Sequence, residues 1–254
     1  MQTATRGTLG WIKPDDNVRP EHDCYKLEPW LNDRGLAGVR TAVETSRSSG
    51  IHEATELFRT GEAQALIPPA KALADAGADV VVWACTSASF IGGLAWSRAQ
   101  AAGISEAIGR PVTSTSLGIL AAAQQLDVRA VDLLGTYPEE VTAVLARFME
   151  DGGLRVEYRH ALNAPTGKAA FALDLCAEAA RFAQMHPNSR NPVVIPDTAA
   201  NSLDLLTELE RVLRRPVITA VQASLWHGLV LLGIRPRIER GGLLFRGEPW
   251  KVAA

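Results

Sequence analysis

Short apolar runs alternate along the chain with longer segments of helical periodicity. The clearest run, 80–84, is continuously apolar and lies between the turn 77–79 and the polar residues that begin at Cys85. Such a run is typical of a strand buried on both faces of a parallel sheet. The same alternation predicts the remaining elements, which are strands at 9–14, 111–115, 130–135, 154–158, 192–195 and 216–220 and helices at 66–76, 91–108, 116–125, 138–150, 168–185, 202–213 and 223–232. Only the charged stretch 20–49 breaks the pattern, and we expect a loop with short elements there. Repeated strand–helix units indicate an α/β fold with parallel sheets.

A weak internal repeat divides this pattern into two halves. An Arg-Pro-Val unit opens a strand at 110–112 and again at 215–217. The strand before each unit ends in a polar turn, which begins at Cys85 in the first half and at Asp197 in the second. Two similar lobes explain the repeat, although α/β chains share much of this pattern without internal kinship. In open α/β sheets, ligands bind at the carboxyl ends of strands, where both turns lie.

Composition narrows the classes of function. The 254 residues include 26 Lys or Arg and 28 Asp or Glu. This balance lacks the excess of positive charge that is typical of proteins that bind nucleic acid or a membrane surface. Three cysteines without metal or redox spacing fit a reducing compartment. The chain shows no membrane-spanning run and no signal sequence, so we expect a cytoplasmic protein. Nucleotide-binding motifs are absent and the five histidines are scattered, so we expect neither cofactor nor metal.

Cys85 is the strongest candidate for chemistry. It follows a buried strand and precedes a predicted helix, whose start offers free backbone N–H groups and the positive end of the helix dipole. Both stabilise a thiolate or a bound carboxylate. Thr86 and Ser87 add hydroxyl donors beside it. The plainer alternative, a buried structural cysteine followed by N-capping hydroxyls, stays open.

The other candidates also follow predicted strands. Asp197 is either a carboxylate that faces Cys85 across a cleft or a simple helix N-cap. Asn17 either donates a hydrogen bond to a substrate carboxylate or shapes a turn. Tyr137 either hydrogen-bonds a substrate or packs. His227, inside an apolar helix, fits a core histidine better than a ligand.

Four segments carry a family resemblance through their order and spacing. They are 10–17 (Gly-Trp-Ile-Lys-Pro-Asp-Asp-Asn), 84–89 (Ala-Cys-Thr-Ser-Ala-Ser), 135–137 (Gly-Thr-Tyr) and 215–226. The chain from 9 to 247 thereby resembles the aspartate/glutamate racemase superfamily, in its maleate isomerase and arylmalonate decarboxylase branch. The resemblance implies two pseudo-symmetric Rossmann-like α/β lobes, each with a mostly parallel sheet flanked by helices, and an active site between the lobes. We assign 1–118 plus 226–254 to the N-terminal lobe and 119–225 to the C-terminal lobe.

The resemblance also implies roles for single residues, in cofactor-free chemistry on small carboxylates. Cys85 fills the position of the first catalytic cysteine, whereas Asp197 stands where the second cysteine is expected. This departure argues against two-cysteine racemisation, and against arylmalonate decarboxylation in its usual form, which uses the second cysteine. Cys85 is then the nucleophile or proton carrier, and Asp197 orients the substrate or handles the opposite proton. The residues implied to bind carboxylate oxygens are Asn17, Thr86, Ser87, Tyr137 and Thr198.

The leading prediction is a cofactor-independent isomerase or racemase of a small (di)carboxylate, closest to maleate cis–trans isomerases. One alternative is a decarboxylase of a disubstituted malonate, with Cys85 or Asp197 as the proton donor. Another is a non-catalytic carboxylate-binding protein. The expected partner is a small carboxylate, without nucleic acid or membrane, and a homodimer is left open.

Overall fold

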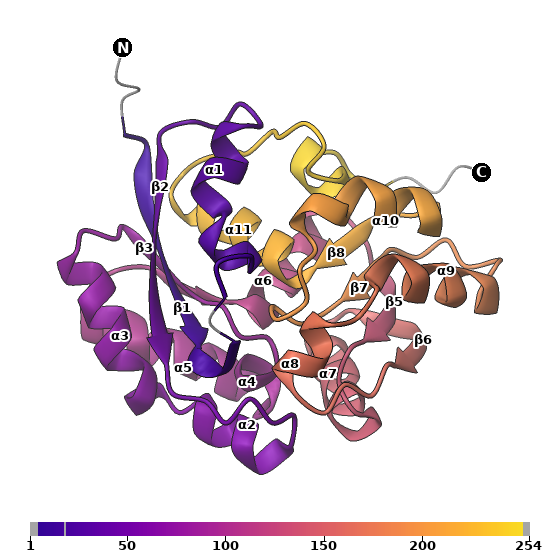
Figure 1. The fold of residues 1–254 in the computed structure, drawn as a ribbon, viewed down its shortest axis with the longest axis horizontal. Helices are drawn as coiled ribbons and strands as arrows, with labels where there is room; N and C mark the ends of the chain where they lie inside the picture. Colours follow the sequence, from indigo (N-terminus) through magenta and orange to yellow (C-terminus); the bar gives the residue numbers. More distant parts are fainter. Residues whose placement is uncertain (1–4, 18, 251–254) are drawn as a thin grey trace.

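Two four-stranded parallel sheets form the framework of the computed structural model, which describes residues 5–17 and 19–250 without the side chain of Asn17 (Figure 1). The first sheet has the order β2-β1-β3-β4, from β1 (Gly7–Pro14), β2 (Val39–Ser46), β3 (Val80–Trp83) and β4 (Val112–Ser114). The second repeats this order as β6-β5-β7-β8, from β5 (Ala130–Gly135), β6 (Arg155–Ala161), β7 (Val193–Ile195) and β8 (Val217–Thr219). The shared strand order confirms the predicted two-lobe α/β fold.

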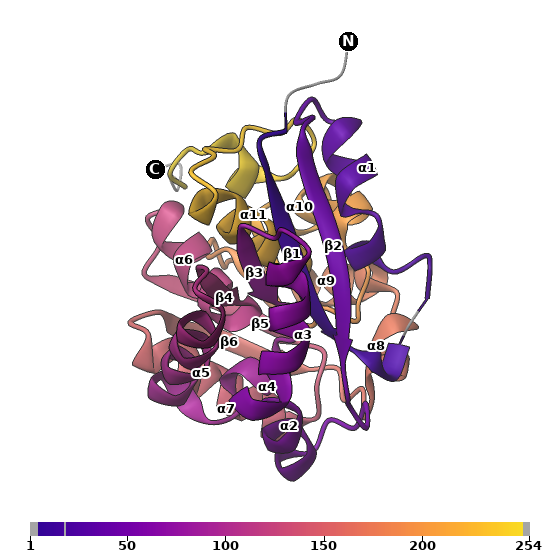
Figure 2. The same cartoon turned by 90° about the vertical axis from the view of Figure 1, so that its left-hand side faces the viewer.

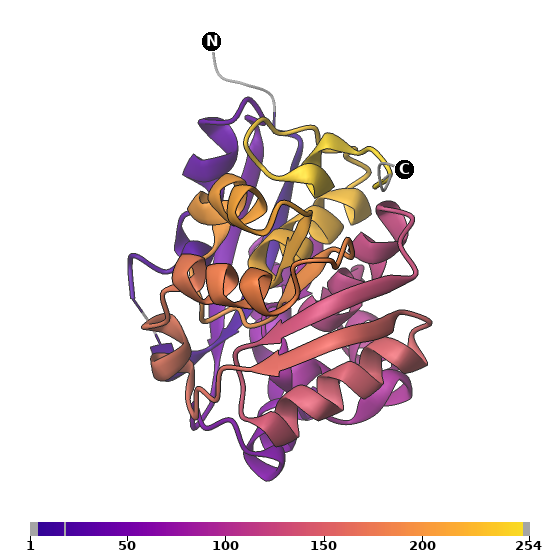
Figure 3. The ribbon, with the colours of Figure 1, turned by 90° about the vertical axis from the view of Figure 1, so that its right-hand side faces the viewer.

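Helices surround both sheets, as the two side views in Figures 2 and 3 show. In the first half they are α1 (Leu27–Asn32), α2 (Ala54–Thr60), α3 (Ala63–Asp75), α4 (Ser87–Phe90), α5 (Gly93–Ile108) and α6 (Thr115–Gln125). In the second half they are α7 (Glu139–Asp151), α8 (Gly167–Phe171), α9 (Leu175–Met185), α10 (Leu206–Leu213) and α11 (Ala220–Leu231). Short 3₁₀ turns, η1 (Asp15–Asn17), η2 (Asp23–Tyr25), η3 (Leu203–Leu205) and η4 (Leu243–Arg246), complete the elements. Within the described residues, no helix has both the length and the apolar character that crossing a membrane requires.

The strand β3 explains why its sequence is apolar throughout. Val80 and Val82 belong to one core cluster, which also holds residues of α1 and α11. Val81 and Trp83 point to the opposite face and join a second cluster with residues of α3 and α5. Successive side chains of a strand alternate between its faces, and here both faces are covered.

Helices α6 and α11 connect the two lobes at the centre of the molecule (Figure 1). Each follows the last strand of its sheet, and the two pack against one another. Gly118 allows this close approach, because a Cβ there would lie 3.0 Å from the carbonyl oxygen of Ala223. Both predicted lobe boundaries, after 118 and before 226, fall within these helices, and that division of the chain stays a prediction.

The stretch 20–49 is not the loop that we expected. It contains α1 and the strand β2, which pairs with β1 over its whole length, from Gly7–Val39 to Pro14–Ser46. β2 lies at the edge of the sheet and leaves several polar side chains accessible, so its sequence lacks the continuous apolar run of a central strand. The predicted helix 168–185 is also divided, because Asp174 caps a new helix by accepting a hydrogen bond from Ala177 N–H at 3.0 Å.

Candidate active site

The loops that follow β3 and β7 bring Cys85 and Asp197 into one pocket between the lobes. Two hydrogen bonds join these loops directly. The Asp197 N–H donates to Thr86 Oγ1 at 3.3 Å, and Thr198 Oγ1 donates to the Ala84 carbonyl at 2.9 Å. The pocket encloses about 430 Å³ of empty space, open solvent included. The two polar turns that the sequence repeat singled out therefore meet at the carboxyl ends of the two sheets.

Cys85 is a buried thiol. The residue is only 7% exposed, and its Sγ lies 3.8 Å from Ser87 Oγ. Burial raises the pKa of Cys85 to about 12, although the Ala88 backbone and Ser87 oppose this rise through hydrogen bonds. The following helix α4 has only four residues, and the Ala88 N–H in its first turn opposes the rise without overcoming the effect of burial. Cys85 therefore keeps its proton at neutral pH.

Asp197 presents its carboxylate through a strained turn. Its φ of 106° lies in the left-handed region that residues other than glycine rarely adopt. Oδ1 accepts a hydrogen bond from Ala199 N–H at 2.9 Å, and Oδ2 accepts one from Thr136 Oγ1 at 3.1 Å. Burial raises the pKa of Asp197, whereas His52 and these two hydrogen bonds oppose the rise. The turn fixes the carboxyl group in a place where holding a charge is costly.

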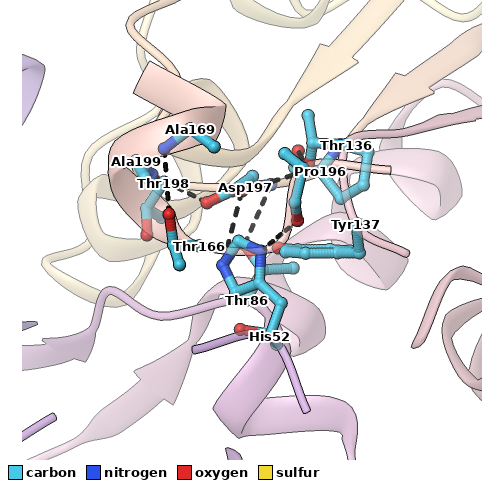
Figure 4. A network of polar contacts seen from close by, with 12 residues as sticks. His52, Thr86, Thr136, Tyr137, Thr166, Ala169, Pro196, Asp197, Thr198 and Ala199 are labelled. Carbon is cyan, nitrogen blue, oxygen red and sulfur yellow. Dashed lines mark hydrogen bonds and ion pairs between the residues drawn. The ribbon is translucent and has the colours of Figure 1, made fainter. Parts of the chain in front are cut away.

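His52 lies beside this carboxyl group, and sequence reasoning passed over it (Figure 4). It precedes α2, and its Nε2 lies 4.0 Å from Asp197 Oδ2. Its Nδ1 lies 2.9 Å from the carbonyl oxygen of Ala164, which belongs to the other lobe. The imidazole also packs edge-on against Tyr137, with ring centroids 4.9 Å apart. No motif surrounds His52 in the sequence, and only the fold brings it to Asp197.

Three further titratable side chains line the pocket. Lys13 is 2% exposed, and its Nζ donates to the Pro14 carbonyl at 2.7 Å. Burial lowers the pKa of Lys13, although nearby acidic groups, Asp16 among them, oppose this. Burial raises the pKa of Asp16, and Lys13 opposes that rise. Burial lowers the pKa of His22 to about 3, so this side chain is neutral. The pocket thus holds one ammonium group and two carboxyl groups.

The predicted carboxylate-binding residues take different places. Ser87 and Thr198 line the pocket. Thr86 is buried, and its hydroxyl accepts the hydrogen bond from the neighbouring lobe. Tyr137 is fully buried, and its hydroxyl has no hydrogen-bond partner within the described part of the chain. Asn17 ends η1, but its side chain lies outside the described residues.

Comparison with known proteins places this geometry in a family. The family model described as arylmalonate decarboxylase matches residues 59–245. The arylmalonate decarboxylase of Bordetella bronchiseptica is 31% identical over 253 residues, which cover 96% of this chain and 99% of that protein. The chain belongs to the arylmalonate decarboxylase family. A maleate isomerase of Pseudomonas putida is 24% identical over 182 residues, 69% of this chain and 72% of that protein.

Solved structures of arylmalonate decarboxylase share the fold. One is a liganded double mutant in which a glycine is replaced by cysteine and a cysteine by serine. It matches with a TM-score of 0.80 and 25% identity, and the match covers 94% of this chain and 98% of that one. A maleate isomerase from Pseudomonas putida S16 matches with a TM-score of 0.84 and 24% identity over 95% of this chain and 98% of that one. The two-lobe α/β architecture is thus common to all three proteins.

In this member of the arylmalonate decarboxylase family, the residues that sequence reasoning missed are charged or titratable. Lys13 lay inside a predicted strand, and Asp16 lay beside a residue that was singled out. His52 had no local signal at all. Between residues 5 and 250, leaving out residue 18, no cluster of three or more His, Cys, Asp or Glu side chains could hold a metal ion. Tertiary structure therefore adds the charges of the pocket to the thiol and carboxyl group that the sequence indicated.

Proposed function

We propose that the protein is a cofactor-independent decarboxylase of a substituted malonate, with Cys85 as the group that delivers a proton to the α-carbon. The observation that carries the proposal is the buried Cys85 thiol, whose raised pKa keeps it protonated, in the same pocket as Asp197. A buried thiol that holds its proton is suited to give it to a carbanion. The near-full-length relation to an arylmalonate decarboxylase supports the same reaction.

The reaction balances with the groups of the pocket. The bond between the α-carbon and the departing carboxylate breaks, its electron pair stays on the substrate, and carbon dioxide leaves. The remaining carboxylate delocalises this pair as an enediolate. The S–H bond of Cys85 then breaks as the α C–H bond forms, and the thiolate regains a proton from water. No electron acceptor is needed.

The lining of the pocket supplies both binding and exclusion of water. Ser87 and Lys13 are donors that can hold the carboxylate that stays. Pro14, Ile51 and Leu57 form an apolar part of the wall, where a departing carboxylate exchanges its water shell for hydrocarbon. Asn17, Thr86, Tyr137 and Thr198 stay predicted contributors to substrate binding, and Asp197 a predicted acid–base group.

The proposal is tested with an arylmalonate in deuterium oxide. We expect carbon dioxide to be released and the monoacid product to carry one deuterium at the α-carbon. Cys85→Ala should lose about 10²-fold or more of the rate, the usual contribution of a positioned acid. Cys85→Ser keeps the size of the side chain but has a far weaker acid, so it should lose a similar factor. Equal turnover by the wild type and Cys85→Ala would refute the role of Cys85.

Maleate isomerisation is the second candidate, and it also uses Cys85. A mutant of the maleate cis–trans isomerase of Nocardia farcinica has been solved with a covalently bound succinylcysteine intermediate. Here a base would first have to take the Cys85 proton. The same preparation should be given maleate, and formation of fumarate without carbon dioxide favours this reaction over decarboxylation.

A non-catalytic carboxylate-binding protein is the third reading. It predicts stabilisation by dicarboxylates without turnover of any arylmalonate, of maleate or of free aspartate and glutamate. Slow alkylation of Cys85 does not separate this reading from the enzyme, because burial raises the thiol pKa in either case. Turnover that depends on Cys85 is the measurement that decides.

A further inference from the structure

The tautomer of His52 follows from one contact. Its Nδ1 lies 2.9 Å from the Ala164 carbonyl oxygen, and a carbonyl oxygen only accepts hydrogen bonds. Nδ1 therefore carries a proton. In a neutral imidazole this leaves the lone pair on Nε2, the nitrogen that faces Asp197 Oδ2 at 4.0 Å. The backbone holds the residue in this orientation, because His52 N–H also donates to the Pro165 carbonyl at 2.9 Å.

A neutral His52 and an ionised Asp197 would set two lone pairs against one another in a buried place. The side chains are only 6% and 5% exposed, so little water is available to separate them. One proton removes the conflict, whether it sits on Nε2 or on the carboxyl group. In both arrangements the two side chains together carry no net charge.

We propose that His52 and Asp197 hold one proton between them, so that this part of the pocket wall is electrically neutral when an anionic substrate binds. His52 is then a positioning residue that acts through Asp197. It allows a carboxyl group to stand beside the site of a substrate carboxylate without repelling it. This inference rests on the proposed function for its consequence, since that function supplies the anionic substrate.

The other charged groups around the two side chains are consistent with this balance. Lys13 and Asp16, which interact electrostatically, form a second pair of opposite charges in the same pocket. His22, Cys85 and Tyr137 are the remaining titratable neighbours, and burial favours the uncharged form of each. Glu53 and Lys168, on the elements next to His52 and Asp197, are exposed to solvent. Asp16 also interacts with His52, but less strongly than with Lys13, so the carboxyl group that would lose its main charged partner with His52 is that of Asp197.

The first test reads the proton directly and needs no ligand. In NMR spectra of protein labelled with nitrogen-15 histidine, the Nε2 chemical shift distinguishes a bare Nε2 from one that carries a proton or accepts a hydrogen bond. The signal that is missing in His52→Asn is that of His52. We expect a protonated or hydrogen-bonded Nε2 at neutral pH in the wild type and a different Nε2 signal in Asp197→Asn. A bare Nε2 in the wild type, or a signal that Asp197→Asn leaves unchanged, overturns the proposal.

The second test measures malonate binding by calorimetry in a double-mutant cycle. His52→Asn keeps an amide donor near the position of Nδ1, for the Ala164 carbonyl, but removes Nε2. We expect it to weaken malonate binding by about tenfold or more, because an unmatched buried charge then faces an anion. In the Asp197→Asn background, position 197 carries no carboxylate that could lose its partner. His52→Asn should therefore alter malonate binding there by less than about twofold. An equal loss in both backgrounds would mean that His52 is merely structural.

Failure of this inference and failure of the proposed function are distinguishable. An active decarboxylase with a bare His52 Nε2 overturns the inference alone. A shared proton in a protein that turns over neither arylmalonates nor maleate overturns the proposed function and leaves the one-proton arrangement standing. Melting curves of the variants show whether each one folds.

Discussion

Burial governs the chemistry of single residues in the pocket. Cys85 and His22 are both shifted toward their uncharged forms, because a charged group loses its hydration when it leaves water. Asp197 is shifted the same way, and His52 opposes the shift. An uncharged thiol is a weak nucleophile but a competent acid. The protonation states of the pocket therefore favour proton delivery.

Slow alkylation of Cys85 is a direct consequence. With its pKa at about 12, roughly one molecule in 10⁵ carries the thiolate at pH 7. We expect iodoacetamide to label Cys85 in the folded protein far more slowly than in urea, as followed by peptide mass spectrometry. Cys24 is a matched control, since burial raises its pKa to about 12 as well. Equal rates for Cys85 in the folded and unfolded protein would contradict this prediction.

His22 makes stability depend on pH. Burial lowers its pKa from 6.5 to about 3, so below pH 6.5 the unfolded chain takes up a proton that the folded protein refuses. The stability that neutral His22 contributes is complete above the unfolded pKa and is lost as the pH falls toward about 3, up to about 5 kcal/mol.

The matched variant for His22 is His22→Asn. It keeps an acceptor for the Cys24 N–H, which donates to His22 Nδ1 at 3.2 Å. Urea unfolding from about pH 7 to pH 4 should show a flatter fall in stability for this variant than for the wild type. Parallel curves for the two proteins would rule out His22 as the source of the pH dependence.

At the scale of elements, a contact between two loops closes the pocket. Gly167 N–H donates to the Gly50 carbonyl at 3.0 Å, and Ile51 pairs with Thr166 as an isolated antiparallel bridge. Asp16 packs against both glycines, and a Cβ at Gly167 would overlap its Oδ2. The loop before α2 and the loop before α8 therefore meet over the acidic side of the pocket.

Gly167→Ala should disturb this closure. We expect a loss of about 1 kcal/mol in the free energy of unfolding, the low end for overpacking because the Asp16 side chain can turn away, together with lower turnover of the proposed substrate. Gly103→Ala is the matched control, because Gly103 lies in α5 and a Cβ there would meet nothing within 4 Å. That change should leave activity intact and stabilise the helix by up to about 1 kcal/mol. Melting curves and turnover of both variants give the comparison, and a Gly167→Ala protein as stable and active as Gly103→Ala would contradict the overlap.

Elements were predictable where burial imposes a pattern. β3 is buried on both faces, and its sequence is an apolar run. The edge strand β2 mixes charged, polar and apolar residues, and the sequence analysis assigned it to a loop. The break between α8 and α9 was also missed, because the apolar spacing continues across it and only the cap at Asp174 marks it. The hydrophobic pattern of a segment therefore predicts buried elements well and predicts elements with one face in water less well.

At the scale of the whole molecule, the pocket belongs to neither lobe alone. In one half its lining comes from β1, η1, the loop before α2, α2 itself, the loop after β3 and the start of α4. In the other half it comes from the loop after β7 and the start of α8. A ligand that contacts both halves binds only the folded state and so stabilises it.

Malonate should therefore raise the melting temperature. At a concentration of about 100 times its Kd the gain is about 2.7 kcal/mol, or roughly 5–10 °C for a chain of this size. Differential scanning calorimetry with sodium chloride at the same ionic strength is the control for a general salt effect. Equal shifts with both salts would mean that no carboxylate site is occupied.

The sequence by itself determined the α/β class, indicated the two-fold repeat and singled out Cys85 and Asp197 as candidates at matching strand ends. These depend on local periodicity and on strand ends, which are written in consecutive residues. Only the tertiary structure decided that His52, Lys13 and Asp16 share the pocket, and that Cys85 is a buried thiol. Protonation depends on desolvation and on charges brought together from distant segments, and neither is encoded in spacing along the chain.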